Sequence, residues 1–139
     1  MSQVALQEHR LAIMTNWALW AGFGMCFVLS GFSRADPVTG LLGFAFVVAG
    51  FISHVIINRI FNTGFTTPQV SLALVAFVIA VLSFIASSVF DPSFGETDVL
   101  VGLIGFSAIM ACFVVYIMIN YGIRGSYAMI DRLNARGHG

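Results

Sequence analysis

The sequence has little charge. Only 9% of its 139 residues are Asp, Glu, Lys or Arg, against about 25% in an ordinary soluble domain. It contains no lysine, and its six arginines are balanced by six acidic residues, which gives a formal net charge of zero. Because no broad basic face can form, we expect no nucleic-acid partner.

Groups that carry chemistry are also scarce. The two cysteines, Cys26 and Cys112, lie in apolar runs without CxxC or Cys/His spacing, so neither a disulfide framework nor a metal site is indicated. No nucleophile–base pair or glycine-rich phosphate loop is present. The polar segments are too short to fold a catalytic domain. We therefore expect the chain not to be an enzyme on its own, while it remains a candidate component of an oxidoreductase complex.

Long apolar runs dominate what is present. Hydrophobic residues make up 59% of the chain, and four runs, 14–32, 41–61, 70–90 and 99–121, have about the 20 residues that a helix needs to cross a bilayer. The sequence therefore predicts an all-α integral membrane protein with four transmembrane helices surrounded by lipid.

The loops and the arginines predict the topology. Short connections make consecutive helices antiparallel. Arg34 alone lies on one side, and the other five arginines lie on the side shared by residues 1–13, 63–69 and 123–139. The positive-inside rule then predicts that both termini are cytoplasmic, which suits a bacterial inner membrane. The two terminal segments could lie on the membrane surface or continue their adjacent helices, and the sequence leaves both alternatives open.

An internal similarity predicts a duplication. A shift of 62 residues aligns the second run with the fourth, and a shift of 55 aligns the first with the third. The most informative matches are Gly40-x-x-Gly43-Phe44 with Gly102-x-x-Gly105-Phe106, Ile57-Asn58 with Ile119-Asn120, and Asp36-Pro37 with Asp91-Pro92. We predict two tandem helical hairpins, 14–62 and 70–122, related as parallel repeats. We expect each Asp-Pro pair to stop the preceding helix and organise a turn.

Small residues recur at matching positions of the second and fourth runs. Small side chains let membrane helices approach closely, so we expect these two runs to form the inner pair of the bundle. The predicted helix-packing residues are Gly43, Ala45, Ala49, Gly105, Ser107 and Ala111.

Polar residues at depth are few. No Asp, Glu or Arg lies centrally in any run, which argues against a carboxylate-coupled transporter. His54 is the one titratable residue of a metal-binding kind at depth, and three interpretations stay open: a haem b ligand, a contact to a quinone or lipid head group, or a hydrogen-bonded structural residue. Asn58 and Asn120 occupy equivalent positions, and Tyr116 takes the place of His54 in the other copy. We interpret these three as polar scaffold.

Three function classes fit these features. We favour a non-catalytic accessory subunit of a larger membrane complex of respiratory or photosynthetic type, packing against larger integral subunits and contacting lipid or quinone. The alternatives are a small homo-oligomeric channel or uncoupled carrier, and a haem-binding electron-transfer subunit that uses His54. We expect no cofactor under the favoured class, with haem b or quinone as the alternatives.

Overall fold

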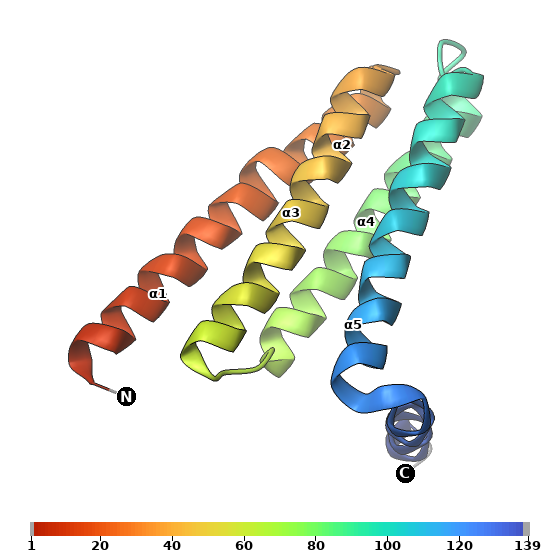
Figure 1. Ribbon diagram of the computed structural model, residues 1–139. Helices are drawn as coiled ribbons and strands as arrows, with labels where there is room; N and C mark the ends of the chain where they lie inside the picture. The colour runs from red at the N-terminus through yellow and green to blue at the C-terminus, as the bar shows by residue number, and fades with distance from the viewer. Residues whose placement is uncertain (1, 138–139) are drawn as a thin grey trace. The chain divides into compact units, whose positions relative to one another are not determined.

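The protein is built from helices alone in the part that the structure describes. The computed structural model describes residues 2–137, apart from the side chains of residues 121, 123–130, 133, 134 and 136. Helices make up most of these described residues (Figure 1). Four helical stretches are long and apolar enough to cross a membrane: Gln3–Ser33, Pro37–Phe61, Thr67–Phe90 and Glu96–Asn120. The prediction of an all-α protein with four membrane-spanning helices is confirmed at this level.

The first span is one continuous helical rod. It consists of α1 (Gln3–Trp17), the π-helical segment η1 (Ala18–Met25) and α2 (Cys26–Ser33). The Ser2 hydroxyl caps its start by accepting a hydrogen bond from the Ala5 amide at 3.1 Å. The N-terminal segment therefore continues the first span as a helix, and the rod begins 11 residues before the start that hydropathy indicated.

The π-helical segment keeps one side of this rod against its neighbour. Four buried residues of the rod are separated from one another by multiples of four positions: Asn16, Gly24, Val28 and Phe32. An α-helix has 3.6 residues per turn, so a spacing of four drifts around the helix by about 40° at each step. A π-helix has more than four residues per turn, so a step of four residues falls short of a full turn there. The π-helical segment therefore rotates the buried side back and offsets the drift of the α-helical parts. Asn16 and Phe32 thus share a buried face although a straight α-helix would separate them.

Local capping sets the ends of the next two helices. Asp36 caps α3 (Pro37–Phe61), where its carboxylate accepts hydrogen bonds from the Thr39 amide at 3.2 Å and the Thr39 hydroxyl at 2.7 Å. Helix α3 ends at Phe61, and the cap residue Asn62 has the left-handed conformation (φ 53°) that asparagine tolerates. Thr66 and Gln69 form a capping box at the start of α4 (Thr67–Phe90).

The two Asp-Pro pairs have different roles. Asp91 follows α4 and accepts hydrogen bonds from the amide and the hydroxyl of Ser93 at 2.9 and 2.6 Å, which organises the turn as expected. Asp36 and Pro37 begin a helix, because the preceding helix has already ended at Ser33. The two Asp-Pro pairs that the sequence comparison aligned therefore differ in local structure.

The chain divides into two compact units, Met1–Phe106 and Ser107–Gly139. In the first unit the rod runs beside α3, and α4 lies against α2, with the N-terminal end of the rod and the α3–α4 loop at the same end (Figure 1). Its core is a cluster of phenylalanine rings centred on Phe32, which is 2% exposed. The rings whose centroids lie 5.3–6.3 Å from that of Phe32 belong to Phe44, Phe84, Phe94 and Phe106.

Glycines allow α2 and α3 to meet backbone to backbone. A Cβ atom on Gly31 would overlap the backbone of Gly40, and one on Gly43 would overlap the backbone of Val28. Phe44 occupies the space beside Gly105 that a Cβ atom there would fill. Glycine is thus required at Gly31 and Gly43 for this close approach.

The second unit contains most of α5 (Glu96–Gly137). Its membrane-spanning part ends at Asn120. At Gly122 the backbone leaves the helical conformation (φ 67°, ψ 174°), and a second helical stretch follows; the ribbon turns there in Figure 1. The C-terminal segment is therefore helical but does not continue the span in a straight line.

Candidate functional site

His54 lies in a buried polar cluster that joins the first two spans. It is 5% exposed on α3, and its Nδ1 atom lies 3.4 Å from Nδ2 of Asn16, which is 6% exposed on α1. These residues are 38 positions apart in the sequence. They meet because the rod runs beside α3 and the π-helical segment after Asn16 keeps Asn16 on the buried side of the rod. His54 is therefore hydrogen-bonded across a helix interface.

Aromatic rings surround the imidazole. Phe65, in the loop between α3 and α4, stacks on it with a centroid distance of 4.6 Å, and Trp17 meets it edge-on at 6.4 Å. Trp20 packs against Gly50, one turn before His54, where a Cβ atom would come within 2.9 Å of the Trp20 Cβ atom. These apolar walls make any hydrogen bond inside the cluster stronger and any missing one more costly.

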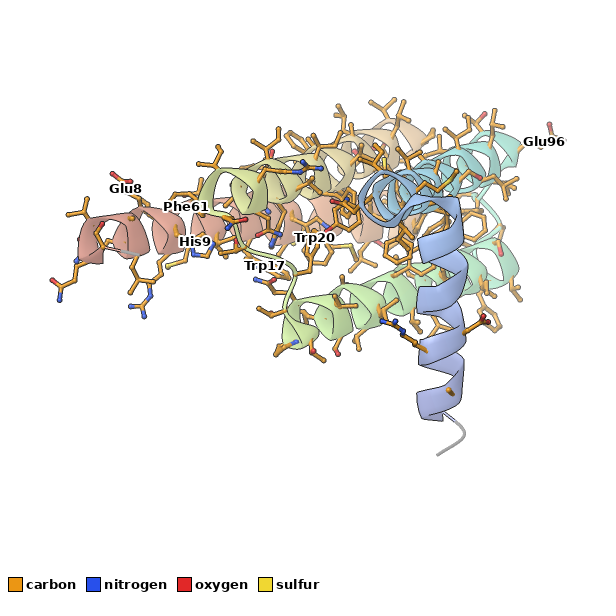
Figure 2. The ribbon with its side chains drawn as sticks, turned by 60° about the horizontal axis from the view of Figure 1, so that its bottom comes forward. Glu8, His9, Trp17, Trp20, Phe61 and Glu96 are labelled. Atoms are coloured by element: carbon orange, nitrogen blue, oxygen red, sulfur yellow. The ribbon has the colours of Figure 1, made fainter. Side chains whose placement is uncertain are left out.

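A second group of polar residues connects the cluster to the surface. Asn58 lies one turn after His54 on α3 and is 6% exposed. The exposed Thr63 donates a hydrogen bond to Asn58 Oδ1 at 3.0 Å, and its hydroxyl oxygen lies 3.4 Å from Nε2 of His9. Figure 2 shows His9 of α1 beside Phe61 near the end of α3, where their ring centroids are 4.9 Å apart. The polar path thus runs from the end of the bundle inward to Asn58.

Three buried polar atoms of this cluster lack hydrogen-bond partners among the described residues: Asn16 Oδ1, His54 Nε2 and Asn58 Nδ2. The Gln69 side chain interacts with the imidazole, although no described group makes a hydrogen bond of good geometry to Nε2. Gln69 Oε1 also accepts a hydrogen bond from the Thr66 amide at 3.0 Å. A buried polar group without a partner costs about 1–3 kcal/mol. The cluster, defined from here on as Asn16, His54 and Asn58, is therefore the part of the protein best prepared to bind something polar.

The residues that the sequence paired as scaffold have different surroundings. Asn58 is buried and bonded to Thr63, whereas Asn120 is exposed and donates to the carbonyl oxygen of Tyr116 in its own helix at 2.7 Å. Tyr116 is half-buried. Asn58 therefore lies in the buried region one turn from His54, and the scaffold role of Asn58, Asn120 and Tyr116 stays a prediction.

The predicted packing residues fall into two sets. Gly43 and Gly105 are buried in helix contacts, whereas Ala45, Ala49, Ser107 and Ala111 are exposed. The helix-packing role of the exposed set stays a prediction.

Sequence reasoning did not connect Asn16 with His54, and it did not find His9, Thr63 or Phe65. Asn16 is the only amide in the apolar run 14–32, and a buried amide needs a partner, which was the available signal. No sequence pattern marks Thr63, because its contact with Asn58 depends on the left-handed turn at Asn62.

The loop carboxylates at the opposite end are engaged locally. Hydrogen bonds from Thr39, the side chain first, lower the pKa of Asp36 below its ordinary 3.8. Ser93 lowers the pKa of Asp91 in the same way. Both groups are structural caps, and no cluster of three or more His, Cys, Asp or Glu side chains suited to a metal ion occurs in the described part of the chain.

No protein-family model, curated protein or solved structure matches this chain. The interpretation of the site therefore depends on its own geometry.

Proposed function

We propose that this chain is a non-catalytic accessory subunit of a larger membrane complex, of respiratory or photosynthetic type, and that it packs against larger integral subunits. The observation that carries the proposal is the exposure of α4. The most apolar 18-residue stretch of α4 has the highest mean hydropathy of the four spans, 2.6. Only 6% of that stretch is buried within the chain, compared with 33% of the corresponding stretch of α3. Only Ala80 of α4 is fully buried.

Exposed small residues also occur on α3. Ala45 and Ala49 lie one turn apart on its exposed side. Lipid tails have no preference for alanine, but small residues let a second helix approach closely enough for van der Waals packing. This supports a protein partner on that face.

Mild-detergent purification of the tagged full-length chain tests the proposal. We expect larger membrane subunits to co-purify at fixed stoichiometry. Ala49→Phe should release them, because a large ring on the exposed side separates the helices without disturbing the internal core. Ala49→Ser is the matched control and should retain them. A chain that purifies alone, or an Ala49→Phe protein that retains every partner, would contradict the proposal.

We also propose the finer topology. The arginine distribution supports cytoplasmic termini in a bacterial inner membrane, and the Gly-x-x-Gly-Phe and Ile-Asn matches support tandem hairpins at 14–62 and 70–122. Single-cysteine variants on a background lacking Cys26 and Cys112 test the orientation. A cysteine in 63–69 should react only with reagents supplied from the cytoplasmic side, and reaction from the outside alone would refute the orientation.

A second candidate function has one observation in its favour. No described residue makes a hydrogen bond to His54 Nε2, and Asn16 faces Nδ1. Metal-ligating histidines donate their second ring N–H to an acceptor, so this function requires the amide orientation in which Asn16 Oδ1 faces Nδ1. A haem-binding electron-transfer subunit is the corresponding hypothesis. A reduced-minus-oxidised visible spectrum of the purified protein decides it, because a haem b ligand would give Soret and α bands.

A further inference from the structure

We propose that the first span is a two-register element, in which the π-helical segment η1 relaxes into α-helix and turns α1 about its axis against α3. The observed register, in which Asn16 meets His54, is the first state. The second state is a straight α-helical rod in which Asn16 has left His54. This proposal goes beyond the accessory role and does not depend on it, because it concerns packing inside the first unit.

The rod contains an apolar stripe that extends beyond the residues buried in the observed register. The members are spaced alternately by four and three residues, the spacing that keeps side chains on one side of a straight α-helix. The stripe consists of Met14, Ala18, Ala21, Met25, Val28 and Phe32. All six side chains are apolar, so a straight rod could present this whole stripe to α3.

The observed register buries only the C-terminal end of the stripe. Val28 and Phe32 are 1% and 2% exposed, whereas Met14 is 70% exposed. Ala18 and Ala21 are exposed as well. The stripe therefore turns away from α3 within η1, the segment where the helix changes type.

A different set of residues faces α3 in its place. Asn16 and Gly24 are buried, and Trp20 packs against Gly50 of α3. Asn16, Trp20 and Gly24 are spaced by four residues, a spacing that stays in line only where a turn holds more than 3.6 residues. The π-helical segment provides such turns. Each type of helix thus selects its own buried side from the same sequence.

The helical repeat gives the size of the change. Met14 lies 18 residues before Phe32, which is about five full turns of an α-helix, so a straight rod aligns the two. Asn16 lies 16 residues before Phe32, which is about 4.4 turns, so a straight rod places it nearly on the opposite side. Relaxation of η1 therefore turns α1 by more than a quarter of a turn.

Two polar contacts hold the observed register. They join Nδ2 of Asn16 to Nδ1 of His54 and Nε2 of His9 to Oγ1 of Thr63, and each measures 3.4 Å. Both exceed the usual length of a hydrogen bond, so each is weak. When α1 turns, the imidazole loses Asn16 and keeps Gln69, which already interacts with it. The turn therefore exchanges two weak polar contacts for burial of the apolar stripe.

His54 is the point at which this element is controlled. A chemical group that displaces Asn16 from Nδ1 removes one of the two contacts that favour the first register, and it shifts the population toward the second. The N-terminal part of α1 then presents another side at the end of the bundle, where His9 meets Thr63 in the observed register. The π-helical segment, a type of helix found frequently at functional sites, thus couples a buried histidine to the surface.

Double electron–electron resonance of the full-length protein in lipid bilayers tests the proposal. Spin labels are attached at the exposed positions Glu8→Cys on α1 and Ile60→Cys on α3, in a background without Cys26 and Cys112. A quarter turn moves a point on the surface of a helix about 10–12 Å in diameter by about 8 Å. We expect Asn16→Ala to change the label distance by several ångströms relative to the protein that keeps Asn16.

Ala18→Phe is the matched variant that blocks the second register. Ala18 is exposed in the first register, so the ring is harmless there, but the ring would lie against α3 after the turn. Asn16→Ala combined with Ala18→Phe should therefore restore the original label distance. Met14→Cys gives a second measurement. It should react with N-ethylmaleimide in the first register, where Met14 is 70% exposed, and be protected when Asn16→Ala is present.

Two results would overturn the proposal. In the first, Asn16→Ala changes neither the label distance nor the reactivity of Met14→Cys. In the second, the distance changes but Ala18→Phe does not reverse it, which indicates local unfolding instead of a second register. If Asn16→Ala does not fold, His54→Leu removes the same contact from the α3 side, and an unchanged distance in that variant overturns the proposal equally.

Discussion

The close contact of α2 and α3 predicts the effect of Gly43→Ala. The added Cβ atom would lie 2.8 Å from both the Phe27 carbonyl carbon and the Val28 Cγ2 atom, and nearer still to the Val28 amide nitrogen. Ordinary contact begins at 3.4 Å, so the helices must separate by more than about half an ångström at this point. Because the obstacle includes backbone, no change of rotamer relieves it.

The magnitude follows from two opposing effects. Overpacking of a close interface costs about 1–3 kcal/mol, and a rigid backbone obstacle belongs at the upper end of that range. Alanine regains about 1 kcal/mol over glycine in a helix. The expected net loss is therefore about 2 kcal/mol of unfolding free energy.

The assay is reversible unfolding in mixed micelles, followed by tryptophan fluorescence, because Trp20 of η1 packs on Gly50 of α3. Gly22→Ala is the matched control. Nothing lies within 4 Å of its added Cβ atom, so it should be neutral or stabilising by up to about 1 kcal/mol. The reasoning would be refuted if Gly43→Ala were as stable as Gly22→Ala.

Three further predictions follow from the core and the caps. Phe32→Ala should cost about 3–5 kcal/mol of unfolding free energy, because the 2%-exposed ring is the centre of the phenylalanine cluster; an equal loss in Phe90→Ala, where the ring is 82% exposed, would contradict this. Thr66→Ala should cost about 1 kcal/mol through loss of the capping box, and Thr66→Ser should restore it in the same assay. Because the pKa values of Asp36 and Asp91 are lowered in the folded state, their ionised carboxylates stabilise it at pH values above the ordinary pKa of 3.8. This contribution is lost as the pH falls through the lowered pKa values. The stability gap between wild type and Asp36→Ala should therefore narrow in acid, and a gap independent of pH down to 2 would show that the carboxylate charge does not act there.

The sequence predicted the spans because hydropathy and helix length are local properties. The apolar runs begin later than the observed helices α3, α4 and α5. Asp36, Thr66 and the first residues of α5 are polar, and hydropathy does not detect a polar helix start. The N-terminal segment was undecided between a surface helix and a continuation, and the Ser2 cap with an unbroken backbone shows the continuation.

The candidate site was only partly predictable. His54 stood out because a titratable residue at depth is costly, but its partner Asn16 is 38 residues away. Their meeting depends on the π-helical register of η1, which has no reliable sequence signal. Asn58 and Asn120 both follow isoleucine, yet Asn58 is buried and Asn120 is exposed.

The proposed role of this chain as a subunit of a larger membrane assembly can be tested by native mass spectrometry of the complex released from mild detergent. We expect one charge-state series in which this chain is bound to larger membrane proteins at fixed stoichiometry, and that series should disappear in Ala49→Phe but persist in Ala49→Ser. A spectrum that contains only the free chain or its homo-oligomer, in wild type as in both variants, would show that the chain is not such a subunit.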